Sequence, residues 1–205
     1  MNSHKLRPRA LFGAALLALC LMAVGATGAQ AAKVKVTGGT TTITPSAATT
    51  QFLTNNGIGV VPIAPATASN GAVTLPIAGG RINPTTLRGF ITHRGGLKFT
   101  KGTKSLVLRH FLITSTNRGA FLDAATPVRR CHALRGRPGR RVCVSRLEGM
   151  RVARLRNVVR NADKSVTADL LLSRPVARFI NRVAGKHVVS AGANIGTLTV
   201  VATTA

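Results

Sequence analysis

The side chains that could do chemistry in this chain are few and far apart. There are four acids, Asp123, Glu148, Asp163 and Asp169, and their spacing suggests no carboxylate pair of the kind that general acid–base catalysis uses. The sequence also lacks the spacing of a nucleophile elbow and the helical motif of a metalloprotease. It therefore predicts a protein that is not an enzyme.

Among the histidines, His93 is the best candidate for binding a ligand. It ends the apolar segment that begins at Gly89 and is followed closely by Gly95 and Gly96, where missing side chains would let a flat ligand approach. A structural role is the alternative for this residue. For His110 a core position is predicted, since it shares strand parity with Leu106, Leu108 and Leu112.

An arginine-rich segment offers a second kind of chemistry. Between Arg129 and Arg160 the chain carries eleven arginines and no lysine, with Glu148 as the one acid. Guanidinium groups suit phosphate and carboxylate polymers such as teichoic acids, although a solvated basic surface is the alternative. The candidate polyanion-binding residues are Arg135, Arg137, Arg140 and Arg141.

Nucleic acid is not the expected partner of this segment. Arg135-Gly136-Arg137-Pro138 matches the core of an arm that reads the DNA minor groove, but the match is four residues long and lies between two cysteines. The chain also lacks Trp and Tyr, which makes base-stacking platforms difficult to build.

The first 31 residues have the features of a secretory signal peptide. An apolar run of 15 residues from Ala10 to Val24, too short for a comfortable membrane span, leads to small residues at Ala29 and Ala31. We expect cleavage after Ala31, a secreted or cell-envelope location, and no transmembrane segment in the mature chain. The run is preceded by the basic residues Lys5, Arg7 and Arg9.

The mature chain is strongly basic. Removal of the three basic residues of the leader leaves 26 Lys and Arg against 4 acids, which lowers the net charge from +25 to about +22. Such a surface attracts polyanions through long-range steering and counterion release. A soluble secreted protein without a dedicated polyanionic partner is the alternative interpretation.

Two of the three cysteines remain after the leader is removed, namely Cys131 and Cys143. If a hairpin is centred on Arg137, these two residues lie directly opposite each other. An exported chain with two cysteines favours a disulfide. A free thiol pair or a metal site is the alternative, but no second pair of ligands occurs at metal-binding spacing.

Two short helices are expected, each opened by a serine and closed by a glycine. The first follows Ser46 and ends at Gly57, and the second follows Ser173 and ends at Gly185. Strands flank both helices, so a strand–helix–strand unit occurs twice, at 43–61 and 170–189. The apolar face of the second helix recurs at helical spacing through Val176, Phe179, Ile180 and Val183.

Between these units, apolar segments alternate with turns that contain Gly, Pro or Asn. The connections are short, which predicts antiparallel hairpins. We therefore expect a mainly β fold, an antiparallel β-sandwich-like domain with two short capped helices in pseudo-repeated units. It would form a single domain over residues 32–205, with a core at about 41–201.

The stretch Leu75-Pro76-Ile77-Ala78-Gly79-Gly80, together with the segment from Gly89 to Leu97, resembles the HtaA domain family. That family is named after haemin-transport-associated surface proteins of bacteria, and the resemblance covers roughly Thr41 to Val201. It implies a mainly β domain outside the cell and, in the haem-binding members, a tyrosine that coordinates iron.

This chain departs from the family at the iron ligand. It contains no tyrosine, and the helix position that corresponds carries Phe52. His93 matches the family's histidine, which implies that it is the residue able to coordinate haem iron here. The resemblance thus implies a secreted, non-enzymatic, haem-related binding domain with weak or lost haem binding. The alternative function is a basic cell-envelope protein that binds anionic polymers through its Arg-rich hairpin.

Overall fold

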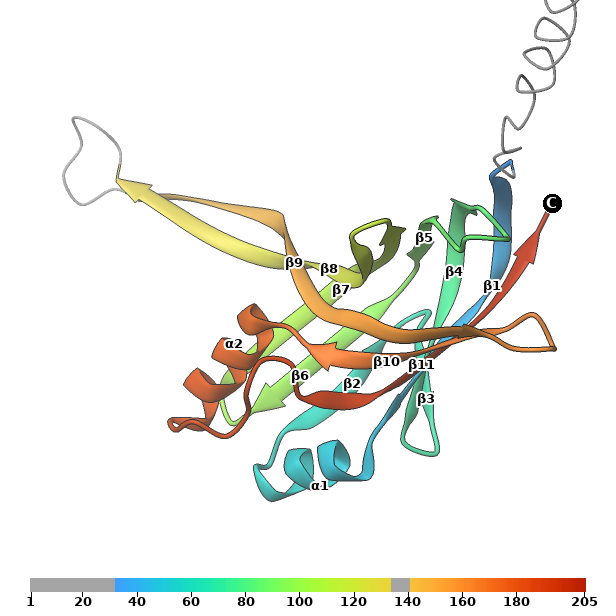
Figure 1. Cartoon of the computed structure of the whole chain (residues 1–205). Helices are drawn as coiled ribbons and strands as arrows, with labels where there is room; N and C mark the ends of the chain where they lie inside the picture. The colour runs from blue at the N-terminus through green and yellow to red at the C-terminus, as the bar shows by residue number, and fades with distance from the viewer. Residues whose placement is uncertain (1–31, 134–140) are drawn as a thin grey trace, which may run out of the picture. The chain divides into compact units, whose positions relative to one another are not determined.

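The computed structural model describes residues 32–133 and 141–205, and in these ranges it contains eleven strands and two helices (Figure 1). The leader predicted at 1–31 and three of the candidate arginines lie outside the described residues. The helices are α1 (Ala47–Asn55) and α2 (Arg174–Ala184). The strands are β1 (Val34–Pro45), β2 (Gly59–Ile63), β3 (Thr67–Ser69), β4 (Ala72–Ile82), β5 (Gly89–His93), β6 (Gly96–Lys101), β7 (Lys104–Thr116), β8 (Gly119–Ala133), β9 (Arg141–Arg160), β10 (Val166–Leu172) and β11 (Asn194–Thr204).

Eight of the strands form a closed antiparallel ring. Their order is β7-β5-β4-β1-β11-β10-β9-β8, and β8 returns to pair with β7. β6 and then β2 extend the sheet from β7, and β3 pairs with β4. The prediction of a mainly β, antiparallel fold with two helices is confirmed, but the strands close into a barrel and the sandwich-like closure is wrong.

The ring closes because the first and last strands of the chain pair with each other. β1 and β11 run antiparallel from Pro45 opposite Gly196 to Val36 opposite Thr204. This pairing leaves neither strand as an edge of the ring, which is how closed sheets avoid open backbone groups. The inward positions form one core, with Leu75, Phe111, Leu122, Leu170 and Leu198 each at most 1% exposed.

Both helices begin as the sequence predicts. The amide of Thr49 donates to the Ser46 hydroxyl at 3.2 Å, and the amide of Val176 donates to Ser173 at 3.4 Å. Gly185 ends α2 in the left-handed conformation with a φ of 73°. The strand expected around Val188 is not formed, because this segment is a loop whose amides donate to the side chain of Asn181.

A β-bulge in β7 overturns the core position predicted for His110. The residue has a φ of 51°, and the register with β8 shifts between Arg109 and Leu112. The extra residue reverses the alternation of the strand. As a result Phe111 is buried, whereas the side chain of His110 is exposed.

β8 and β9 continue beyond the ring as a two-stranded arm (Figure 1). From Thr126 onward β8 pairs with β9 alone among the described strands. The predicted register is confirmed, since Cys131 and Cys143 are partners across the arm. The disulfide between them stays a prediction.

No helix within residues 32–133 and 141–205 is long and apolar enough to cross a membrane.

Candidate functional site

Both helices and the β6–β7 hairpin border an apolar groove, which we call the interhelical groove. Its cavity volume is about 60 Å³. α1 and the residues after it contribute Leu53 and Ile58, and the remaining lining residues come from the hairpin and from α2. The apolar residues that line it are Leu53, Ile58, Phe99, Leu106, Val176, Phe179 and Ile180.

The amphipathic pattern of α2 explains why this groove is left open. Val176 and Ala177 are buried, while Phe179 and Ile180 on the next turn are half-buried. Phe99 stands opposite Leu106 across the β6–β7 ladder, and both are also half-buried. The groove therefore presents apolar side chains that the fold does not cover, a feature typical of binding sites.

Two lysines lie at the hairpin end of the groove. Lys101 and Lys104 pair across the turn, which Gly102 closes with a φ of 54°, and both line the groove. An apolar surface beside two ammonium groups complements a flat apolar ligand that carries carboxylates.

The described residues of the groove supply no ligand for haem iron. Proteins hold haem iron through His, Cys, Met or Tyr, and the polar residues of the groove are instead Thr100, Lys101, Lys104 and Ser105. Phe52 of α1 is half-buried and has no donor atom. The described lining therefore offers apolar contacts and two ammonium groups, and it does not fit a coordinated metal.

His93 lies inside the barrel and is 3% exposed. Its Nδ1–H donates to the carbonyl oxygen of Phe111 at 3.0 Å, because a carbonyl can only accept. Its Nε2 then accepts from the Thr41 hydroxyl at 2.7 Å. Burial lowers the pKa of His93, and the hydrogen bond to Phe111 offsets part of this effect, so the ring is neutral and both nitrogens are engaged.

This geometry separates His93 from the interhelical groove, whose lining does not include it. Iron coordination would require Nε2 to give up its bond to Thr41 inside the core. The haem-binding role stays a prediction for His93, and its position favours the structural alternative.

The acids take structural positions on separate parts of the fold. Asp123 accepts a hydrogen bond from Arg151 at 3.0 Å, and Asp169 accepts one from Asn157 at 2.7 Å. Within the described ranges, no three His, Cys, Asp or Glu side chains lie close enough together to hold a metal ion.

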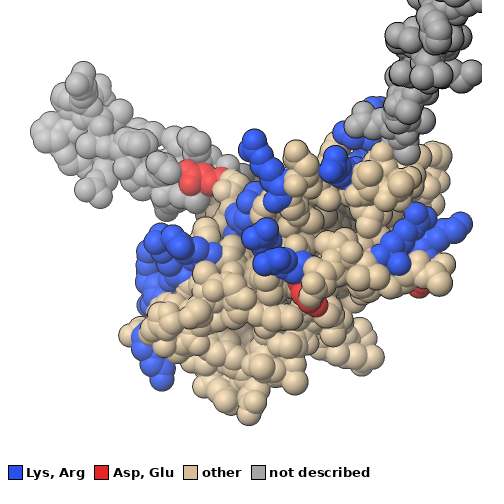
Figure 2. Space-filling model, viewed as in Figure 1, with Lys and Arg blue, Asp and Glu red and all other residues tan. Residues whose placement is uncertain are grey.

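The candidate polyanion-binding arginines are not placed by the structure. Arg135, Arg137 and Arg140 lie outside the described residues, and Arg141 is the first residue of β9. On the face drawn in Figure 2, Lys and Arg are spread over several separate parts of the surface and acids are sparse.

The closed antiparallel ring, the additional strands on β7 and the two capped helices define the fold of an HtaA-like domain, as the sequence resemblance implied. The C-terminal domain of HtaA from Corynebacterium glutamicum has a TM-score of 0.60 to this chain at 15% identity, covering 84% of this chain and 99% of that domain. The haem-binding protein HtaB from the same organism gives a TM-score of 0.52 at 12% identity, covering 84% and 96% of the two chains. At these identities the similarity is one of fold. No model of a known protein family matches the sequence, and no curated protein does.

Proposed function

We propose that this chain is a secreted, non-enzymatic binding domain that uses the interhelical groove to hold a flat apolar molecule with acid groups. Haem is the named candidate, bound weakly and without a protein ligand to its iron. The observation that carries the proposal is an uncovered apolar groove beside Lys101 and Lys104 on an HtaA-like fold. The solved relative HtaB is a haem-binding protein, which supports the ligand class.

The dimensions of the groove support weak binding. Pockets that enclose a drug-sized ligand measure about 300–1,000 Å³, whereas this groove measures about 60 Å³. A porphyrin would therefore insert one edge between Phe99 and Phe179 and leave most of its surface in water. Without an axial bond, affinity rests on this partial apolar burial and on the two lysines.

Titration of residues 32–205 with haemin and with metal-free protoporphyrin IX tests the proposal. We expect dissociation constants for the two ligands that agree within about threefold, since iron adds no protein bond. Replacing both lysines, in the variant K101S/K104S, should raise the dissociation constants of both ligands by the same factor. The matched control K33S/K35S removes two exposed lysines at the start of β1 and should change neither.

Two results would overturn the proposal. Haemin binding far tighter than protoporphyrin IX binding would demonstrate an iron ligand, and loss of that difference in His93→Gln would assign it to His93. If neither ligand binds, flat apolar molecules with acid groups are excluded as ligands of the groove.

A tyrosine introduced into the groove provides a gain-of-function test. Leu53 lies on α1 and lines the groove, so Leu53→Tyr adds a phenol that can coordinate iron. Haemin binding should tighten while protoporphyrin IX binding stays unchanged. Leu53→Phe is the matched control, because it adds the ring without the oxygen.

Secretion is part of the proposal and rests on the leader-like sequence of residues 1–31. N-terminal sequencing of the exported protein should give Ala32 as the first residue. Retention of the leader in the exported protein would exclude cleavage after Ala31. The alternative partner, an anionic envelope polymer, rests on the Arg-rich segment and is tested separately below.

A further inference from the structure

A second cavity opens at the other end of the barrel, and we call it the barrel-mouth cavity. α1 follows the end of β1, whereas this cavity is lined by Val34 at the beginning of β1 and by Ile82 at the end of β4. Its volume is about 210 Å³, more than three times that of the interhelical groove. The described residues that line it include none of those that line the interhelical groove.

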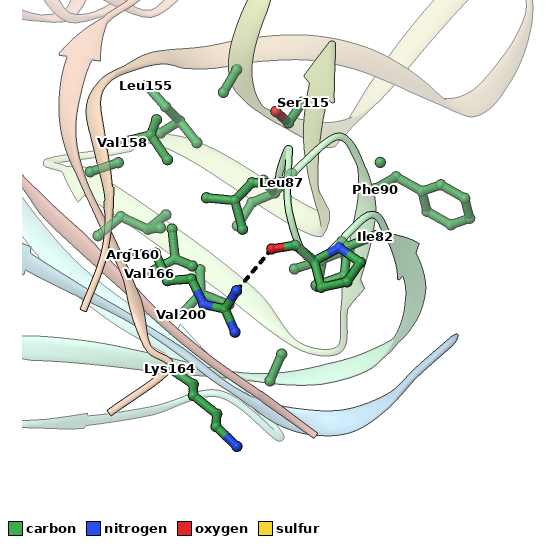
Figure 3. Close-up of a pocket in the computed structure, with 18 of the residues that line it drawn as sticks. Ile82, Leu87, Phe90, Ser115, Leu155, Val158, Arg160, Lys164, Val166 and Val200 are labelled. Carbon is green, nitrogen blue, oxygen red and sulfur yellow. Dashed lines mark hydrogen bonds between the residues drawn. The ribbon is translucent and has the colours of Figure 1, made fainter. Parts of the chain in front are cut away.

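All eight strands of the ring contribute to this cavity (Figure 3). The lining is mainly aliphatic. Pro84 and Leu87, in the loop between β4 and β5, also line the cavity. Among the lining residues, Phe90 and Val158 are 45% and 40% exposed, and the ring of Phe90 points away from the other lining side chains (Figure 3). An eight-stranded barrel is wide enough to hold either its own side chains or one small ligand, and here part of the interior is left unfilled.

Two cations stand at this mouth. Arg160, at the end of β9, donates from Nη1 to the carbonyl oxygen of Pro84 at 2.9 Å and so reaches across the opening (Figure 3). Lys164 lies in the β9–β10 turn, with a φ of 66°. Both residues line the cavity, and no acid is among the described lining residues.

A β-bulge brings Arg160 to the cavity. Leu155 and Arg160 differ in parity and would face opposite sides of a regular strand, yet both line the cavity. Asn157 lies between them with a φ of 49°, and the register with β10 shifts at this point. The bulge thus turns the end of β9 inward, which is how bulges redirect side chains beside binding sites.

The turn that carries Lys164 is fixed by its own hydrogen bonds. The amide of Lys164 donates to the Asn161 carbonyl at 3.0 Å. The neighbouring acid, Asp163, accepts from both the amide and the hydroxyl of Ser165, at 2.9 and 2.7 Å. The Asp163 carboxylate is therefore held by Ser165 and does not line the cavity.

We propose that the barrel-mouth cavity binds a single aliphatic chain that ends in a carboxylate or phosphate. The chain would lie inside the ring, and its anionic head would contact Arg160 and Lys164. The volume of about 210 Å³ lies below that of pockets for drug-sized ligands, which favours a single slender chain over a bulkier molecule. This site is separate from the interhelical groove and does not depend on the function proposed for it.

Displacement of a fluorescent fatty acid, dansylaminoundecanoic acid, tests the site in residues 32–205, which form one compact unit containing every described strand pairing. Dodecanoate and dodecyl phosphate should displace the probe, whereas dodecyltrimethylammonium should not. The variant R160S/K164S should lower the affinity for dodecanoate by about tenfold or more, since charge-assisted hydrogen bonds are lost. Its affinity for dodecanol should stay unchanged. The control R94S/R109S removes two exposed arginines outside the cavity and should have no effect.

Filling the cavity separates this site from the interhelical groove. Ala202→Phe adds a ring at a half-buried lining position and should abolish probe binding while porphyrin binding persists. Ser115→Phe fills the same cavity from β7 if the first variant fails to fold. Probe binding that survives in a folded cavity-filled variant, equal affinity for the anionic and cationic amphiphiles, or no probe binding at all would each overturn the proposal.

Discussion

At the scale of single residues, His93 acts as a polar connection inside an apolar barrel. It lies on β5, and its two hydrogen bonds reach Thr41 on β1 and the backbone of Phe111 on β7. Thr41 is itself fully buried. A buried polar pair of this kind is stable because every donor and acceptor has a partner, so the ring is held as the neutral form with the proton on Nδ1.

His93 should make stability depend on pH. Burial lowers its pKa in the folded state, so the unfolded chain takes up the proton first as the pH falls below about 6.5. Its contribution is complete above that pH and decreases as the pH falls toward the lowered folded value. Urea unfolding between pH 7.5 and 5.5 should show a loss of up to about 1.4 kcal/mol per pH unit.

Two variants isolate this effect. His93→Gln should flatten the pH dependence, whatever its absolute stability, because the titrating group is gone. His110→Gln removes an exposed histidine and should keep the slope of the parent chain. A slope that persists in His93→Gln would assign the pH dependence to another group.

The sequence predicted the strand that carries His93 but not its partners. The residue shares strand parity with Ile91, and both are buried, so alternation alone could have indicated an inward position. Thr41 is 52 residues away, and no local pattern indicates that contact. For His110 the same alternation failed, because a bulge in β7 is not visible as a change in residue type.

At the scale of elements, two glycines of the HtaA-like stretch allow neighbouring strands to lie close together. A Cβ on Gly80 would collide with the carbonyl oxygen of Phe90, and one on Gly96 would collide with that of Leu108. A Cβ on Gly38 of β1 would meet no atom within 4 Å. The glycines therefore differ in how much space the fold leaves them.

Alanine substitution should reveal this difference. Gly80→Ala and Gly96→Ala should each lower the free energy of unfolding by about 1–3 kcal/mol, the range of overpacking in a rigid core. Gly38→Ala should stay within about 0.5 kcal/mol of the parent. Urea unfolding of the three variants measures these free energies. Equal losses of stability at all three positions would show that the close approach of neighbouring strands is not the cause.

The arm of β8 and β9 should be stabilised locally by the predicted disulfide. In the chain-entropy model a loop of this length contributes about 3 kcal/mol. Because β8 pairs with β9 alone beyond Thr126, reduction should speed tryptic cleavage in the arm and leave the main thermal transition unchanged. C131S/C143S should not respond to reductant, and two alkylatable thiols in the unreduced, denatured chain would refute the bond.

The helix ends were predictable because capping is local. Ser46 and Ser173 each accept from the amide three residues further on, and Gly185 needs only its own left-handed conformation. Helix positions relative to the sheet depend on packing, which is why the sequence did not reveal the interhelical groove. The clue lay in the α2 pattern, where Phe179 and Ile180 continue an apolar face beyond the part that the barrel buries.

At the scale of the whole molecule, barrel and sandwich differ in one strand pairing. Alternating strands and short turns are common to both closures. Whether the strands close into a barrel depends on the pairing of β1 with β11. These two segments lie at opposite ends of the described chain, and neither carries a motif that specifies the other. The barrel-mouth cavity follows directly from this pairing, so it could not be predicted either.

Charge also acts at this scale, since the mature chain carries about +22 through 26 Lys and Arg. A field of this size attracts any polyanion, so binding alone does not identify the Arg-rich segment as a site. The salt dependence of binding identifies a site, because each contact with a nucleic-acid phosphate contributes about 0.7–0.9 to the slope of log K against log salt. We expect a similar contribution from the phosphates of teichoic acid.

Two variants with the same loss of charge separate a site from a general field. One replaces Arg135, Arg137, Arg140 and Arg141 with serine, and the control replaces the exposed Arg88, Arg94, Arg109 and Arg118. If the segment contacts teichoic acid directly, its variant should lower the slope by about 3, whereas the control should lower affinity with little change in slope. Equal changes in both variants would mean that teichoic acid responds to the net charge of the domain and that the Arg-rich segment is an ordinary solvated surface.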